Sequence, residues 1–91
     1  MNLNAVCLKN PEVVARKVSD EFILVPLSND IADMDSIYTM NEVGAFIWEN
    51  INGKLTINDL IDEVLLEFDV SPETAKNDVV DFFEDIKIFL K

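Results

Sequence analysis

Residues 36–54 read SIYTMNEVGAFIWENINGK and contain the point at which the chain changes from strand to helix. The first residues suit a pleated strand, because Ile37, Tyr38 and Thr39 are β-branched or aromatic. Asn41 then predicts a helix N-cap, and apolar residues follow at helical spacing. The helix is expected to end at Asn52-Gly53, since such a pair favours a left-handed helix end. This joint therefore consists of a strand, a capped turn and a helix.

Two further strands are predicted before the joint. Residues 12–18 (EVVARKV) are β-branched and partly alternating, and residues 22–27 (FILVPL) form a short apolar run. Pro26 within that run favours a strand edge or a strand end. The polar break between the two runs predicts an antiparallel hairpin. The polar, acidic residues 28–35 (SNDIADMD) predict a loop that leads to the third strand, residues 36–40.

Two further helices are predicted after the joint. Thr56 and Asp59 have the spacing of a capping box, and Ser71-Pro72-Glu73 is typical of a helix start. The last helix runs to about Phe89, and its main apolar stripe is Ala75, Val79, Phe82, Ile86 and Phe89. Three strands followed by three helices indicate an α+β domain with a three-stranded antiparallel sheet. We expect residues 1–11 to be a flexible N-terminus and residues 12–91 to form a single domain.

The composition favours a folded, acidic protein. Apolar residues make up 49% of the chain, and 18 acidic against 7 basic residues give a net charge of −11. This charge repels phosphate backbones and anionic membranes, so neither nucleic acid nor a membrane is a predicted partner. A single cysteine, Cys7, and the lack of a signal-like N-terminus predict a soluble protein in the reducing cytoplasm.

The side chains needed for catalysis or for tight metal binding are missing from the sequence. There is no histidine, and the two glycines, Gly44 and Gly53, do not form a phosphate-binding loop. Asp30, Asp33 and Asp35 lack the spacing of a calcium-binding loop. We therefore predict a protein that is not an enzyme and that uses no cofactor and no metal.

One alternative gives a chemical role to Ser36. Asp35-Ser36-Ile37 resembles the motif on which acyl and peptidyl carrier proteins hold phosphopantetheine. Carrier proteins are all-helical, however, whereas strands are predicted before this motif. The predicted helix cap is also Asn41 rather than Ser36.

The ordered set of segments resembles the PqqD family, which includes recognition elements for precursors of ribosomally made, post-translationally modified peptides. The resemblance covers about Val13 to Leu90. It rests on the hairpin (VAR with FIL), the joint (YTMNEVG followed by IW), the pair NG before TINDL, and VVDFF in the last helix. Met40 stands where the family often has leucine. The loop before the third strand lacks a glycine turn, and no glycine follows the last helix.

The resemblance implies a winged-helix-like fold and a non-catalytic, peptide-binding adaptor. The leader of a precursor peptide would add a strand to the third strand, lie against the third helix, and be presented to a modifying enzyme, often a radical S-adenosylmethionine enzyme. An open strand edge can bind an extended peptide through its unpaired backbone groups. The predicted assembly is a monomer or a strand-exchanged dimer.

Peptide-binding residues are predicted at two places. The strand edge contributes Asp35, Ser36, Ile37, Tyr38, Thr39 and Met40, of which Tyr38 and Met40 are expected to point inward. On the last helix, a second row beside the main stripe consists of Lys76, Val80, Phe83 and Lys87. This row is either a cleft wall whose lysines meet acidic leader residues, or a boundary row with lysines reaching to solvent. Trp48 is expected in the core, with a role as binding anchor as the alternative.

Overall fold

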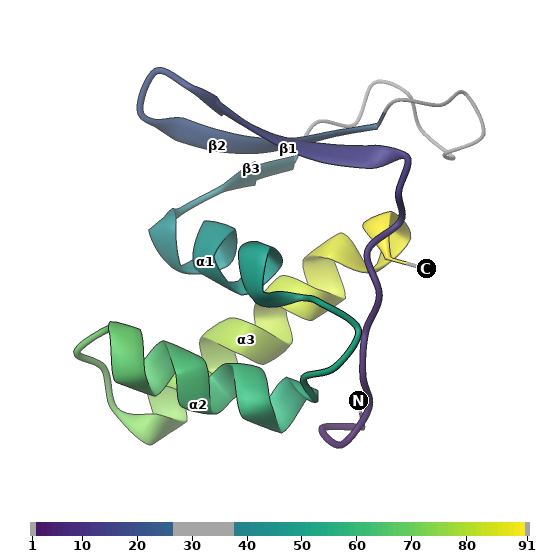
Figure 1. Cartoon of the computed structure of the whole chain (residues 1–91). Helices are drawn as coiled ribbons and strands as arrows, with labels where there is room; N and C mark the ends of the chain where they lie inside the picture. The colour runs from purple at the N-terminus through teal and green to yellow at the C-terminus, as the bar shows by residue number, and fades with distance from the viewer. Residues whose placement is uncertain (1, 27–37, 91) are drawn as a thin grey trace.

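The chain folds as a three-stranded antiparallel sheet followed by three helices, as the sequence predicts (Figure 1). The computed structural model describes residues 2–26 and 38–90. The elements, in order, are β1 (Val13–Val18), β2 (Glu21–Pro26), β3 (Tyr38–Met40), α1 (Glu42–Asn50), α2 (Ile57–Glu67), α3 (Pro72–Ile86) and a short 3-10 helix, η1 (Lys87–Phe89). The predicted α+β class is confirmed.

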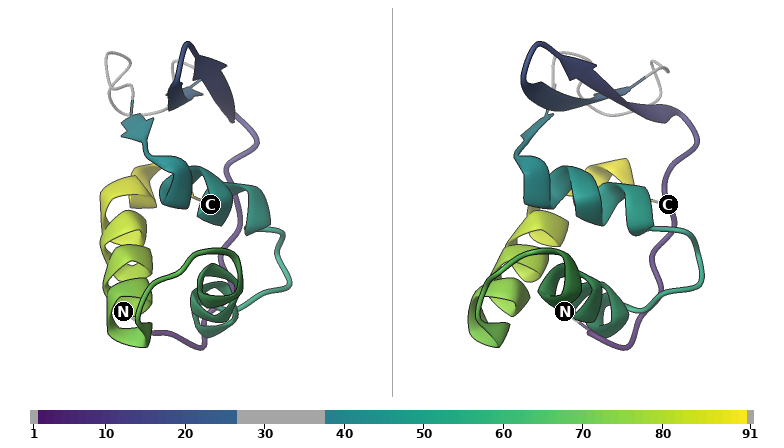
Figure 2. Two further views of the ribbon diagram at one scale, coloured as in Figure 1. Left: turned by 90° about the vertical axis from the view of Figure 1, so that its left-hand side faces the viewer. Right: turned by 60° about the vertical axis from the view of Figure 1, so that its left-hand side comes forward.

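The sheet has the strand order β1-β2-β3, so β3 is an edge strand. Ile23 of β2 pairs with Arg16 of β1 on one side and with Thr39 of β3 on the other. The sheet forms a layer over α1 and the C-terminal part of α3. Helix α2 lies farther from the sheet than α1 does (Figures 1 and 2). This arrangement leaves the outer edge of β3 close to α3.

The predicted caps fix where the helices begin. The Asn41 side chain accepts a hydrogen bond from the Gly44 amide, and Thr56 and Asp59 form the predicted capping box. The Ser71 side chain accepts from the Thr74 amide. Gly53 has the expected left-handed backbone, with φ of 77°, but it lies in the loop after Ile51, the residue that caps the end of α1.

The N-terminal segment is packed against the helices rather than detached from them. The amides of Ile57 and Asn58, at the start of α2, donate to the carbonyls of Ala5 and Leu3 (3.1 and 2.9 Å). The Lys9 ammonium lies 5.3 Å from the centre of the Trp48 ring. These contacts attach the segment to the helices, and the flexibility of residues 1–11 stays a prediction.

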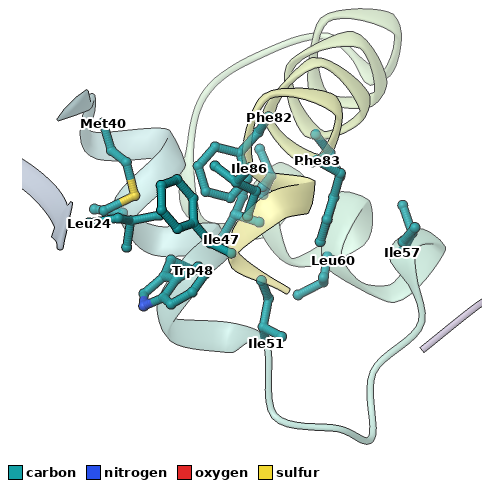
Figure 3. Packing of buried hydrophobic residues seen from close by; sticks show 14 of the residues in the cluster. Leu24, Met40, Ile47, Trp48, Ile51, Ile57, Leu60, Phe82, Phe83 and Ile86 are labelled. Carbon is teal, nitrogen blue, oxygen red and sulfur yellow. The ribbon is translucent and has the colours of Figure 1, made fainter. Parts of the chain in front are cut away.

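The core lies between the three helices and beneath the sheet (Figure 3). All five residues of the predicted stripe are buried, four on α3 and Phe89 in η1, and Trp48 is 3% exposed, as expected for a core residue. Leu24 and Met40 bring the sheet into the same cluster. No helix within residues 2–26 and 38–90 is long and apolar enough to cross a membrane.

Candidate functional site

A groove of about 470 Å³ lies between β3 and α3, with the start of α1 at its base. The buried residues that line this groove form its floor, and the exposed ones form its rim. The lining residues are Tyr38, Thr39, Met40, Asn41, Val43, Gly44, Ile47, Asp78, Asp81, Phe82 and Asp85. The volume is in the range of small ligand sites. One wall is an edge strand, so the groove lies beside unpaired backbone groups of the sheet.

Gly44 lets the three elements of the groove come close together. A Cβ atom at this position would lie 3.1 Å from the Phe82 ring and 3.3 Å from the Met40 Cβ, closer than ordinary van der Waals contact. The start of α1 can therefore pack tightly between β3 and α3. The apolar floor that results holds Ile47 and Phe82, both buried, and the half-buried Val43.

Tyr38 links the two walls of the groove. Its hydroxyl donates to a carboxylate oxygen of Asp85 (3.1 Å), and its ring packs edge-on against Phe82, with the ring centres 6.2 Å apart. Partial burial, together with the adjacent Asp85 carboxylate, raises the pKa of the Tyr38 hydroxyl above its ordinary value. At neutral pH the hydroxyl is therefore protonated and able to donate.

The rim formed by α3 is acidic. Asp78, Asp81 and Asp85 are exposed on one side of the helix and line the groove. The single ion pair within the described residues joins Lys87 to Glu84 (3.1 Å) and leaves these three carboxylates without a cation. No group of three metal-ligating side chains is close enough to hold a metal ion in this part of the chain.

The strand half of the predicted site is placed only in part. Tyr38, Thr39 and Met40 line the groove, and their alternation is as expected, because Met40 is buried, Tyr38 is half-buried and Thr39 is exposed. Asp35, Ser36 and Ile37 lie outside the described residues.

The helix half of the predicted site does not line the groove, and its role in peptide binding stays a prediction. Phe83 is 1% exposed and points toward Leu60 of α2 (Figure 3). Lys76 and Lys87 are exposed and Val80 is half-buried, but none of the four residues lines the groove. At about 100° per residue, this row and the aspartate row lie on opposite sides of the buried stripe of α3. The lysine row borders α2, whereas the aspartate row borders β3.

The sequence reasoning missed the aspartates, Phe82 as a groove residue, and the part of α1 beneath them. The pattern on α3 contained two rows beside the main stripe, one with lysines and one with aspartates. Which row faces the sheet depends on how α3 packs between α2 and β3, and the sequence of the helix does not specify this.

Comparison with protein families matches residues 21–87 to the family described as coenzyme PQQ synthesis protein D (PqqD). The match covers more than half of the chain. The chain belongs to the PqqD family. Comparison with curated proteins gave no match.

Two solved structures share this PqqD-type fold. One is described as TbiB1 in complex with the TbiA(beta) leader peptide; it is 22% identical, has a TM-score of 0.70, and the match covers 92% of this chain and 94% of that chain. The other is described as lasso peptide synthetase B1 complexed with the leader peptide; it is 16% identical, also has a TM-score of 0.70, and the match covers 91% of this chain and 92% of that chain. At these identities the two structures establish a common fold.

Proposed function

We propose that this PqqD-family chain is a non-catalytic adaptor for a precursor peptide. The leader of a ribosomally made precursor adds a strand to the outer edge of β3 and lies in the groove against α3. The adaptor then presents the rest of the precursor to a modifying enzyme, of which a radical S-adenosylmethionine enzyme is the expected type. Both the binding of the precursor and its modification by the enzyme take place in the cytoplasm.

The observation that carries this proposal is the position of the groove beside the β3 edge. In an added strand, backbone groups pair with the edge while alternate side chains point to one face. The groove supplies an apolar floor on the side toward α3. Family membership and the fold shared with two leader-peptide complexes support the same function.

No observation favours the carrier alternative, in which Ser36 holds phosphopantetheine. Ser36 lies outside the described residues, and three strands precede the first helix, whereas carrier proteins are all-helical. Intact mass after incubation with a promiscuous phosphopantetheinyl transferase provides a simple check. We expect no added mass.

The proposed function is tested by calorimetric titration with a synthetic leader peptide encoded beside the gene. We expect binding with a micromolar or lower Kd. The Val43→Trp variant places a large ring in the groove, and we expect it to weaken binding at least tenfold. The matched control is Leu66→Trp, because Leu66 is 83% exposed on α2, away from the groove. Circular dichroism checks that both variants are folded.

Either of two results would contradict the proposed binding of the leader in the groove. One is a leader that does not bind and whose modification by the partner enzyme is unchanged when the adaptor is added. The other is equal loss of binding in Val43→Trp and Leu66→Trp. The adaptor alone should leave the mass of the leader unchanged, and a mass change in its presence without the enzyme would contradict a non-catalytic role.

A further inference from the structure

The inference concerns the chemistry of the peptide and rests on the proposed function. A strand added to β3 has every second side chain directed to the same face. Those that point toward α3 meet a groove with two kinds of surface. The floor is apolar, with Val43, Ile47 and Phe82, and the α3 rim carries the carboxylates of the three aspartates.

Within residues 2–26 and 38–90, no lysine or arginine forms an ion pair with the carboxylates at this rim. The Lys76 and Lys87 side chains lie on the other side of α3, and Lys87 is already paired with Glu84. The segment 27–37 contains three aspartates and no lysine or arginine, so its sequence has no cation to offer. A positively charged peptide side chain can therefore form ion pairs with these carboxylates.

Lysine and arginine match both surfaces of the groove. Their long aliphatic stems can cover apolar surface while the charged group reaches a polar rim. An arginine can also stack on an aromatic face, and the half-buried Tyr38 provides such a ring next to Asp85. An acidic peptide side chain would instead meet like charges at close range.

The spacing of the aspartates matches the spacing of an extended peptide. Asp81 and Asp85 are four residues apart, which corresponds to about 6 Å along a helix axis. Alternate side chains of a strand are about 6.7 Å apart. In an added strand that runs along α3, two basic residues separated by one residue can each meet one aspartate.

We propose that the peptide held on β3 carries lysine or arginine at one or two alternate positions facing α3, and that Asp78, Asp81 and Asp85 select them. This assignment reverses the charge expected from the sequence, where Lys76 and Lys87 pointed to an acidic leader. The aspartates then act as specificity residues of the groove, while the β3 backbone binds the peptide without regard to its sequence.

The probe is a phage-displayed library of random 12-residue peptides, selected on the immobilised full chain in 0.15 M NaCl. At this ionic strength, charges more than about 8 Å apart are largely screened, so general attraction to the acidic protein is reduced. We expect the enriched peptides to contain an excess of lysine or arginine at positions i and i+2. One enriched peptide is then synthesised with a fluorescent label for anisotropy measurements.

Two sets of charge-removing variants distinguish recognition in the groove from general attraction to the acidic protein. Asp78→Asn/Asp81→Asn/Asp85→Asn is expected to raise the Kd of the labelled peptide at least tenfold. Asp62→Asn/Glu67→Gln/Asp69→Asn removes the same charge from exposed positions outside the groove and is expected to change the Kd less than threefold. If the triple groove variant has a lowered Tm, Asp78→Asn/Asp81→Asn tests the same point and keeps the Tyr38–Asp85 hydrogen bond.

Three results would overturn the inference. Enriched peptides without a basic excess, but sensitive to Val43→Trp, would remove it and leave the proposed function standing. Equal effects of the groove and control variants would show general charge attraction. A library that yields no binder would also overturn the inference, whereas the leader titration judges the proposed function separately.

Discussion

At the scale of single residues, the contact between Tyr38 and Asp85 shows which parts of the site a sequence can reveal. Strand alternation alone predicts that Tyr38 points inward, because side chains two residues apart in a strand lie on the same face and Met40 is expected in the core. Its partner could not be predicted, since Asp85 is 47 residues away and the contact depends on how α3 sits beside β3. The same holds for Gly44, whose close approach to Phe82 and Met40 becomes visible only when the three elements are packed.

Tyr38→Phe is expected to make the stability depend less on alkaline pH. The raised pKa of Tyr38 means that the folded state favours the protonated hydroxyl. The stabilisation is therefore fully present below the ordinary tyrosine pKa of about 10 and is lost as pH rises through the higher folded value. We expect about 0.5–1 kcal/mol at pH 8, a modest value because the side chain is only half-buried.

Urea unfolding of both proteins at pH 8 and pH 11 checks this prediction. Other groups titrate in both proteins, so the measured quantity is the difference between their free energies of unfolding. This difference should shrink or reverse at pH 11. A difference that is the same at both pH values would contradict the role given to the Tyr38–Asp85 hydrogen bond.

At the scale of elements, α3 has different surroundings on three of its sides: the core, α2 and the groove. The stripe that the sequence predicts is the core side, and the helix starts at the predicted cap because Ser71 accepts from the Thr74 amide. The two flanking rows differ in neighbour: the row with Phe83 lies toward α2, whereas the aspartate row lines the groove beside β3, which Phe82 of the central stripe also reaches. Periodicity could locate all three rows but could not say which neighbour each one meets.

The adjacent phenylalanines give a matched test of this division. Phe82→Leu and Phe83→Leu are the same change on the same helix, and each is expected to cost about 1 kcal/mol of stability. Only Phe82→Leu should weaken peptide binding, by about threefold to tenfold, because only Phe82 lines the groove. Calorimetric titrations at 15 °C, where both variants are folded, measure the two Kd values. Equal weakening in both variants would refute the assignment.

At the scale of the whole molecule, the N-terminal segment joins parts that are distant in sequence. Val6 forms a bridge with Thr56, and Lys9 forms one with Leu90, so the segment connects the start of α2 to the end of the chain (Figure 1). The sequence of residues 1–11 has no hydrophobic period, which is why it predicted a flexible segment. Its contacts use mainly backbone groups, and these leave no pattern in the side chains.

Deletion of residues 2–9 is expected to destabilise the fold by about 3–4 kcal/mol. The change removes two backbone hydrogen bonds to the first amides of α2, each worth about 1 kcal/mol. It also exposes the core surface covered by Leu3 and Cys7, which adds about 1–2 kcal/mol. Thermal unfolding followed by circular dichroism measures the effect as a lower Tm. An unchanged Tm would mean that the segment contributes nothing to the folded state.

Strand addition on β3 is tested most directly by residue-resolved amide hydrogen exchange with and without a saturating leader peptide. The sheet has two edges, β1 and β3, and they act as mutual controls in one experiment. The account predicts slower exchange within Tyr38–Met40 on binding and no change in Val13–Val18. Protection of β1, or saturated binding with no protection in β3, would contradict it.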